Sequence, residues 1–216
     1  MLVKKWKLML IISGLFLLSS CSNISAKQSG TKKIVSTVAN TKQSLWKKRQ
    51  VTLAKKAAWG LNSKIALRYR ADHWNFGLSW LQQSKKQYVM QIKNPVTGGL
   101  LAKLSRKNNK VSLLADDGKI YKDSDEERLL LRQTGVKLPI KGMQYWVRGL
   151  TSPAYKVDKV VLDARGRPLS LIQAGWKINY SKYISNNVDA MPRKIIITRD
   201  KDSVYLKMIA KKWKGI

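Results

Sequence analysis

Apolar residues occupy every second position along much of the chain, with polar or charged residues between them. Because successive side chains of a β-strand point to opposite faces, this period of two predicts strands with one apolar face. The clearest alternation runs through Ile65, Leu67 and Tyr69, then Trp74, Phe76, Leu78 and Trp80, then Tyr88, Met90 and Ile92. Further strands are predicted at 99–105, 110–115, 155–163, 168–174, 175–183, 193–199 and 203–213.

Short turn sequences separate these strands. Asp116-Asp117-Gly118-Lys119 predicts a hairpin turn, because Asp-Gly tolerates the positive φ angles of tight loops. Turns are also predicted at Arg165-Gly166 and at 199–202. Short strands at regular spacing, with turn signals between them, predict an antiparallel meander.

Three segments break the alternation and predict helices. "SLWKKRQVTLAKKAAW", 44–59, places apolar residues near one face and lysines on the other, and Ser44 is in position to cap it. "DSDEERLLLRQTG", 123–135, has a capping box of Ser124 and Glu127 and ends at Gly135. "LPIKGMQYWVRGL", 138–150, predicts a second short helix that begins at its proline. The combined pattern indicates a mainly β (α+β) fold, in which helices cover an opening in one curved antiparallel sheet.

The N-terminus has the layout of a secretory signal peptide. Lys4, Lys5 and Lys7 precede an apolar run that is too short to span a membrane, and small residues follow before Cys21. The tetrad Leu-Ser-Ser-Cys at 18–21 resembles the bacterial lipobox, in which the cysteine takes a diacylglycerol and an N-acyl chain. The simpler alternative is an ordinary signal peptide that ends near a cysteine.

The lipobox interpretation divides the chain into three parts: a signal peptide at 1–20, a lipidated Cys21 with a flexible tether at 21–42, and one folded domain at 43–216. The tether is rich in Ser, Thr, Lys and Asn and has no aromatic residue. With a single cysteine, no disulfide framework is possible. Ser22 lies at the position that sorting systems for such proteins inspect, and serine there implies delivery to the outer membrane.

The charge of the chain is strongly positive. It has 43 Lys and Arg against 12 Asp and Glu, a formal net charge of +31. Such a body is attracted to anionic partners, which outside the cytoplasm include phospholipid head groups and lipopolysaccharide. A basic bias of the whole source proteome explains the charge equally well. Scattered basic residues and the absence of any nucleic-acid-binding motif argue against a nucleic-acid partner.

Residues typical of catalytic and metal sites are scarce. His73 is the only histidine, is expected in a short loop between strands, and has no partner for a metal site. The acidic cluster within 116–127 could be read as a calcium loop, but turn chemistry and a helix N-terminus explain it fully. No base is apparent for a serine nucleophile. We therefore expect a binding or transfer protein that is no enzyme and uses no cofactor or metal.

The segment "IKNPVTGGLLAKL", 92–104, forms a loop between two predicted strands. Asn94 and Pro95 start a turn, the glycines at 98–99 let the chain leave it, and Val96 lies at the tip with nothing evident to cover it. By itself this is most simply a hairpin whose valine folds back on the sheet, because single exposed apolar residues are common.

The whole chain resembles the LolB family, the outer-membrane lipoprotein receptors of the Lol pathway. The resemblance covers 44–213 and rests on Cys21 with Ser22, the Trp-bearing helix at 44–59, "WGLNSKIALR", "NPVTGG", "LPIKGMQYWVRGL", "GWKINYSKY", "MPRKIIITR" and "LKMIAKKW". Two positions depart from the family: Val96 stands where the family usually has leucine, and Ser63 lies where a glycine is often found.

The resemblance implies an unclosed antiparallel β-barrel with a helical lid over an apolar cavity. It further implies a monomer that takes lipoproteins from the soluble periplasmic carrier LolA and inserts their acyl chains into outer-membrane phospholipid without nucleotide. The loop Asn94, Pro95 and Val96 would dip into the bilayer. The acyl-chain cavity would be lined by Phe76, Leu78, Trp80, Tyr88, Met90, Ile92, Trp146 and Trp176. The alternative function is a lipid-anchored binding protein for an anionic envelope polymer.

Overall fold

The computed structural model describes the fold of residues 28–215 and the side chains of residues 37–215. The chain divides into two units, 1–37 and 38–216, and the first contributes to the described residues only the opening turns of helix α1 (Gln28–Lys55). Everything else described belongs to the second unit. Its strands are β1 (Trp59–Tyr69), β2 (Asp72–Ser84), β3 (Gln87–Lys93), β4 (Leu100–Lys107), β5 (Lys110–Ala115), β6 (Ile120–Asp123), β7 (Val157–Leu162), β8 (Pro168–Gln173), β9 (Trp176–Tyr183), β10 (Pro192–Arg199) and β11 (Val204–Lys214).

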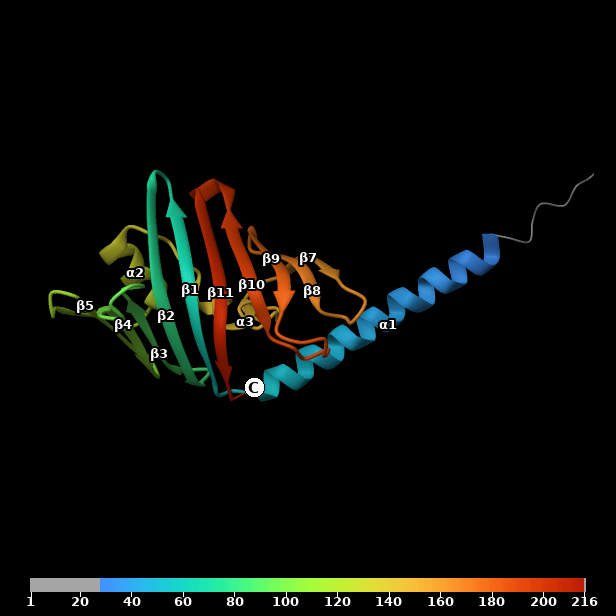
Figure 1. Cartoon of the computed structure of the whole chain (residues 1–216), viewed down its shortest axis with the longest axis horizontal. Coiled ribbons are helices and arrows are strands. Elements are labelled where there is room, and N and C mark those ends of the chain that lie inside the picture. The colour runs from blue at the N-terminus through green and yellow to red at the C-terminus, as the bar shows by residue number, and fades with distance from the viewer. Residues whose placement is uncertain (1–27, 216) are drawn as a thin grey trace, which may run out of the picture. The chain divides into compact units, whose positions relative to one another are not determined.

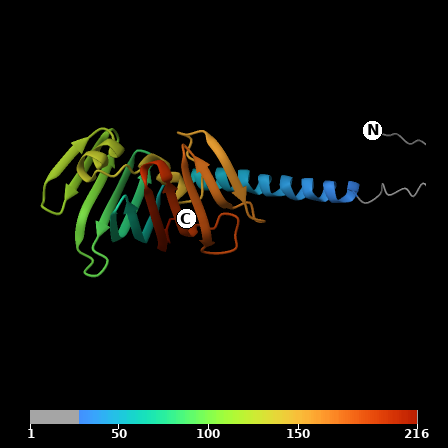
Figure 2. The ribbon, with the colours of Figure 1, turned by 90° about the horizontal axis from the view of Figure 1, so that it is seen from above.

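All eleven strands form one antiparallel sheet, in the order β6-β5-β4-β3-β2-β1-β11-β10-β9-β8-β7. The first and last strands pair at its centre, with Ile65 opposite Met208 and Leu67 opposite Leu206. Strands β6 and β7 are the two edges, so the sheet is curved but does not close on itself (Figures 1 and 2). This confirms the predicted fold class.

Two helices connect the edges of the sheet. Helix α2 (Glu126–Thr134) follows β6, and helix α3 (Ile140–Trp146) leads toward β7. Both helices lie across the concave side of the sheet (Figure 2). The apolar faces predicted from the alternation meet beneath them, where Leu78, Leu104, Ile195 and Met208 are buried in one core.

A fully buried arginine fastens the C-terminal part of α1 to the segment after α3 and to the loop between β9 and β10. Arg49 is 0% exposed, and its guanidinium donates to the carbonyl oxygens of Val188 at 2.6 Å and Ala190 at 2.9 Å. It also donates to the carbonyl oxygens of Arg148 at 2.6 Å and Gly149 at 3.3 Å. Burial lowers the pKa of Arg49, but no carboxylate is among its hydrogen-bond partners. Four carbonyl dipoles hold the cation instead, which makes Arg49 a structural anchor.

The hairpin between β7 and β8 approaches α1 very closely. Gly166 has φ of +68°, and a Cβ placed there would lie 2.5 Å from Cβ of Leu45 and 2.8 Å from the backbone nitrogen of Trp46. Both the left-handed conformation and the close backbone approach therefore require glycine at this turn.

The structure corrects four details of the sequence interpretation. The first helix runs from Gln28 to Lys55 instead of 44–59, so that part of the segment predicted as a flexible tether is helical. Strand β6 was not predicted. His73 lies within β2, exposed and opposite Arg68, and is not in a loop. Asp125, rather than Ser124, caps α2.

Candidate functional site

An apolar cavity lies between the concave face of the sheet and the two connecting helices. Its volume is about 50 Å³. All of its lining side chains are apolar: Ile65, Phe76, Leu78, Met90, Ile92, Leu104, Leu130, Leu138, Ile140, Met143 and Leu206. The strands supply one wall, and α2, α3 and the segment between them supply the other. Such a lining can hold hydrocarbon and offers nothing to a polar ligand.

The structure places four of the predicted cavity residues on this lining: Phe76, Leu78, Met90 and Ile92. Alternation along β2 and β3 brings them to the same face of the sheet, with Leu78 opposite Ile92. The sequence interpretation missed the lining residues from the helices, such as Leu130 and Met143. Their signal was the apolar face of each helix, which indicates burial but not what the helix covers.

The other four predicted cavity residues belong to the packed core beside the cavity. Trp80 and Tyr88 are 1% and 0% exposed, and their ring centroids are 6.1 Å apart. The ring centroids of Trp146 and Trp176 are 6.2 Å apart. Nε1 of Trp146 donates to Oε1 of Gln173 at 2.8 Å. Their indole and phenol rings thus fill the interior beside the cavity.

The cavity is too small for an acyl chain in this conformation. A volume of about 50 Å³ is less than two water molecules occupy in the liquid, at about 30 Å³ each. An acyl chain would fit beneath α2 and α3 only if these helices moved away from the sheet. The contacts that hold these helices decide how readily the cavity opens.

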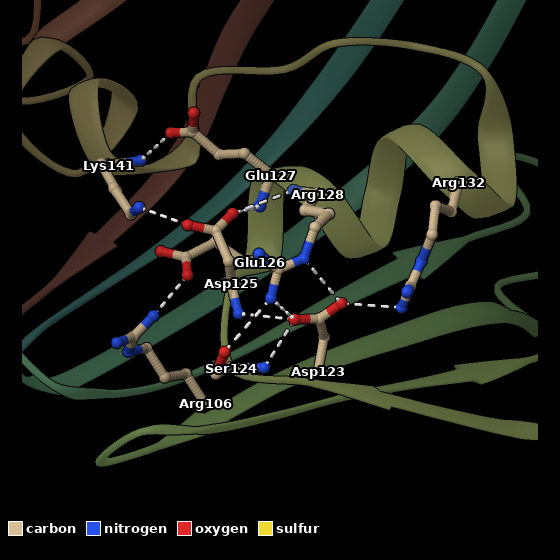
Figure 3. Close-up of polar contacts among 9 residues, drawn as sticks. All are labelled: Arg106, Asp123, Ser124, Asp125, Glu126, Glu127, Arg128, Arg132 and Lys141. Carbon is tan, nitrogen blue, oxygen red and sulfur yellow. Dashed lines mark hydrogen bonds and ion pairs between the residues drawn. The ribbon is translucent and has the colours of Figure 1, made fainter.

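A cluster of ion pairs holds the N-terminal ends of the two helices (Figure 3). The Asp125 side chain accepts from the backbone nitrogens of Glu127 at 3.0 Å and Arg128 at 2.9 Å, and so caps α2. Lys141 of α3 donates through Nζ to Asp125 at 2.6 Å and through its backbone nitrogen to Glu127 at 3.1 Å. Glu126, 1% exposed, pairs with Arg106 of β4.

Asp123, the last residue of β6, completes this cluster. It pairs with Arg128 and, at 2.7 Å, with Arg132, both on α2. Together these pairs attach α2 to the sheet and to α3, and Arg132 extends the attachment to the last turn of α2 (Figure 3). Part of the acidic cluster that the sequence singled out therefore forms a helix clasp, made by Asp123, Asp125, Glu126 and Glu127, whereas Asp117 pairs with Lys119 in the turn before β6.

The clasp predicts that stability falls in acid. Hydrogen bonds from Arg128 lower the pKa of Asp123. Burial opposes ionisation of Asp125, but hydrogen bonds from Lys141 and α2 outweigh it and lower its pKa. A depressed pKa contributes stability above the unfolded value, 3.8 for both, that is lost as pH falls through the folded value. Burial raises the pKa of Glu127, which acts in the opposite direction.

We therefore expect the free energy of unfolding, measured in urea, to decrease as pH is lowered below about 4. Asp123→Asn should flatten this decrease, because the variant has no carboxylate to protonate at that position. A matched variant, Asp116→Asn, removes an exposed carboxylate outside the cluster and should leave the slope unchanged. An unaltered slope in Asp123→Asn would contradict the role of the clasp.

The loop between β3 and β4 projects Val96 into solvent. The Asn94 side chain accepts from the backbone nitrogens of Val96 at 2.9 Å and Thr97 at 3.1 Å, and Gly98 leaves the turn with φ of +75°. Val96 is 91% exposed, so it does not fold back on the sheet. The loop geometry thus presents an apolar tip on a braced turn.

Two neighbouring leucines extend this apolar tip. Leu100 and Leu101 begin β4 and are 43% and 38% exposed. Sequence analysis had not singled them out, although two adjacent leucines interrupt the alternation. Cys21 and Ser22 lie outside the described residues, so lipidation and sorting at these positions remain predictions.

No helix among the described residues is long and apolar enough to cross a membrane. Within that same part of the chain, no group of three or more His, Cys, Asp or Glu side chains is arranged to hold a metal ion.

Comparison with known proteins yields one family. The model of the family "Outer membrane lipoprotein LolB" matches residues 57–213. A relative from Pseudomonas fluorescens, the outer-membrane lipoprotein LolB, is 31% identical over 205 residues, 94% of each chain. The protein of that name from Alkalilimnicola ehrlichii is 32% identical over 155 residues, 72% of this chain and 76% of its own.

A solved structure shares the fold. A putative outer membrane lipoprotein-sorting protein domain from Vibrio parahaemolyticus has a TM-score of 0.50 at 8% identity, covering 82% of this chain and 92% of that one. At this identity the likeness concerns the architecture alone.

Proposed function

The chain belongs to the LolB family of outer-membrane lipoproteins, and from this premise we propose that it accepts lipoproteins from the periplasmic carrier LolA and passes their acyl chains into the outer membrane. The family serves lipoprotein localisation and is not a family of enzymes. The observation that carries the proposal is the all-apolar cavity between the concave face of the sheet and helices α2 and α3.

Acyl chains need a continuous apolar path. Three chains carry about 45 methylenes, and exposing them to water costs about 0.8 kcal/mol each, or roughly 36 kcal/mol in total. Free diffusion across an aqueous compartment is therefore negligible. A receptor whose cavity holds the chains somewhat better than the carrier, and less well than a bilayer, transfers them downhill without nucleotide.

The small cavity suits this role because only hydrocarbon cargo makes its opening favourable. Displacing α2 and α3 exposes their apolar faces and those of the sheet, which costs free energy while the cavity is empty. Hydrocarbon that enters covers the same surfaces and offsets that cost. The receptor thus stays closed when empty and opens in proportion to the cargo it holds.

The loop around Val96 is where the acyl chains would pass from the receptor into the membrane. An apolar side chain that is 91% exposed on a braced turn can enter the acyl region of a bilayer without rearranging the fold. The positive charge of the chain, +31, favours an anionic membrane surface. Cys21, once acylated, would keep this loop within reach of the membrane.

Cavity and surface charges should have different effects on transfer. Leu138 is half-buried and lines the cavity, whereas Leu131 is 43% exposed on α2 and does not. We expect Leu138→Glu to slow transfer of a labelled lipoprotein from LolA by at least tenfold, because ionised glutamate in an apolar cavity disfavours hydrocarbon.

Leu131→Glu introduces the same charge on the same lid and should transfer at close to the original rate. Circular dichroism establishes that both variants are folded. Equal rates in the two variants would contradict a role of this cavity in transfer.

A further inference from the structure

A second cavity, of about 420 Å³, lies between the last turns of α1 and the end of α3. Its remaining walls come from the start of β1, the end of β2 with the turn after it, and the segment that follows α3. It shares no lining residue with the first cavity. Trp59 lies on its wall, and the ring of Trp80, 5.1 Å from that of Trp59, is part of the buried layer behind it. The two cavities are therefore separate sites.

The lining combines an apolar wall with unbalanced positive charge. Val51, Ala54, Ala57, Trp59, Leu150 and Pro153 supply the apolar surface. Arg148 and Lys85 supply two cations, and none of the lining residues is acidic. A volume of several hundred Å³, an apolar wall and a few polar groups are typical of small-ligand sites.

Arg148 is the principal polar group of this cavity. It is 6% exposed, and its Nη1 donates to the carbonyl oxygens of Leu53 at 2.9 Å and Lys56 at 3.0 Å. Its Nε donates to the carbonyl oxygen of Gln144 at 3.3 Å, and its guanidinium lies 5.4 Å from the Trp59 ring centroid. Nη2 makes no hydrogen bond to the described residues. No side-chain carboxylate of the described residues pairs with this buried cation, although the carbonyl groups that end α1 offset part of its charge.

Arg148 and Gln50 give this wall its polar character. Burial lowers the pKa of Arg148 to about 10, so the side chain remains charged at neutral pH. Gln50 lies on the same wall, and its Oε1 accepts from Thr151 while its buried Nε2 has no hydrogen-bond partner among the described residues. The donor that the cavity presents is Nη2 of Arg148, on a charged side chain of its wall, and an oxyanion there would satisfy it.

We propose that this cavity binds an anionic amphiphile, a carboxylate or phosphate ester on a short alkyl chain. The anion would meet Arg148 and Lys85, and the chain would lie along Ala54, Ala57 and Trp59. At about 30 Å³ for a water-sized group, 420 Å³ holds roughly a dozen non-hydrogen atoms, the size of decanoate. Neither the separation of the two cavities nor this chemistry depends on the transfer function proposed above.

Calorimetric titration with decanoate and with decanol, below the concentrations at which they aggregate, tests the site. The protein is the mature chain from residue 21 with Cys21→Ala, so that no attached lipid competes. We expect decanoate to bind at least tenfold more tightly than decanol, because only the carboxylate pairs with the cations. Equal affinity for the two ligands would overturn the proposal.

Three variants locate the binding. Ala54→Trp places a large ring on the exposed helix face that lines the cavity, and should weaken decanoate binding at least tenfold. Lys85→Glu, at the exposed rim, should weaken the binding of decanoate several-fold and leave the affinity for decanol unchanged. Leu138→Glu alters only the first cavity and should leave decanoate binding unchanged. The opposite pattern, with binding lost in Leu138→Glu and kept in Ala54→Trp, would overturn the proposal.

Flotation with phosphatidylglycerol vesicles identifies the source of the ligand. If Ala54→Trp weakens vesicle binding in parallel with decanoate binding, the site takes its ligand from a bilayer. If vesicle binding is unchanged while decanoate binding is lost, the site takes a free molecule. Arg148→Met should abolish the preference for decanoate over decanol. Should that variant fail to fold, Lys85→Glu tests the same charge dependence without disturbing the end of α1.

Discussion

Replacing Arg49 with methionine is expected to lower the free energy of unfolding by about 4 kcal/mol, because buried carbonyl groups lose their donors. The guanidinium serves four carbonyl oxygens, and it is fully buried. Methionine keeps an unbranched apolar stem, but it is shorter than arginine and donates nothing. Urea unfolding of the chain 21–216 with Cys21→Ala, followed by circular dichroism, measures the change.

The control for this variant is Lys47→Met, on the exposed side of the same helix. It should change stability by less than about 0.5 kcal/mol, since it removes no buried contact. Arg49→Lys should fall between the two, because an ammonium keeps the charge but cannot reach all four carbonyl groups. A loss below about 1 kcal/mol in Arg49→Met would show that α1 is fastened mainly by its apolar contacts.

Replacing Val96 with glutamate is expected to slow delivery of lipoprotein into liposomes by about 30-fold, with little effect on uptake from the carrier. Burial of a valine side chain in hydrocarbon is favourable by about 2 kcal/mol, and each 1.36 kcal/mol changes a rate tenfold. The side chain is 91% exposed and makes no contribution to the core, so the fold should be unaffected. Separate measurement of uptake and release distinguishes this loop from the cavity.

Two further variants calibrate that result. Val96→Leu adds one methylene, worth about 0.8 kcal/mol, and should speed delivery by up to about fourfold. Gln83→Glu adds the same single charge at an exposed position on β2, and should leave delivery near the original rate. If Val96→Glu delivers as fast as Gln83→Glu, the loop does not enter the bilayer.

The strands were predictable from the sequence because a strand with one buried face has apolar residues at every second position. Ile65, Leu78 and Met90 alternate with polar residues and are buried against the same core. Strand β6 was missed because its four residues, "IYKD", are too few to show a period and run directly into a helix. Helix α1 was shortened because its first half is rich in Ser, Thr, Lys and Asn, and its few apolar residues give only a weak amphipathic signal.

The sites were less predictable, because they depend on contacts between distant segments. Alternation identified four side chains that line the first cavity, but its small volume depends on how closely α2 and α3 approach the sheet. Arg49 carried a usable signal, since it shares a helix face with Trp46 and Leu53, both buried. Arg148 carried no signal that could be read locally, because two of its three acceptors lie 95 and 92 residues away, in α1 and just beyond it.

The pairing of β1 with β11 at the centre of the sheet has a kinetic consequence. Strand β1 pairs with β2 on one side, but its pairing with β11 on the other side can form only after residues 204–214 have been made. The contacts between β1 and β11 therefore span most of the chain. Contacts of such long sequence separation slow folding, and they leave unpaired strand edges exposed in the meantime. The meanders β1–β6 and β7–β10 can each assemble earlier, and the last strand then joins them. A chain crossing a membrane N-terminus first would thus stay unfinished, and open to a holding chaperone, until its final strand emerged.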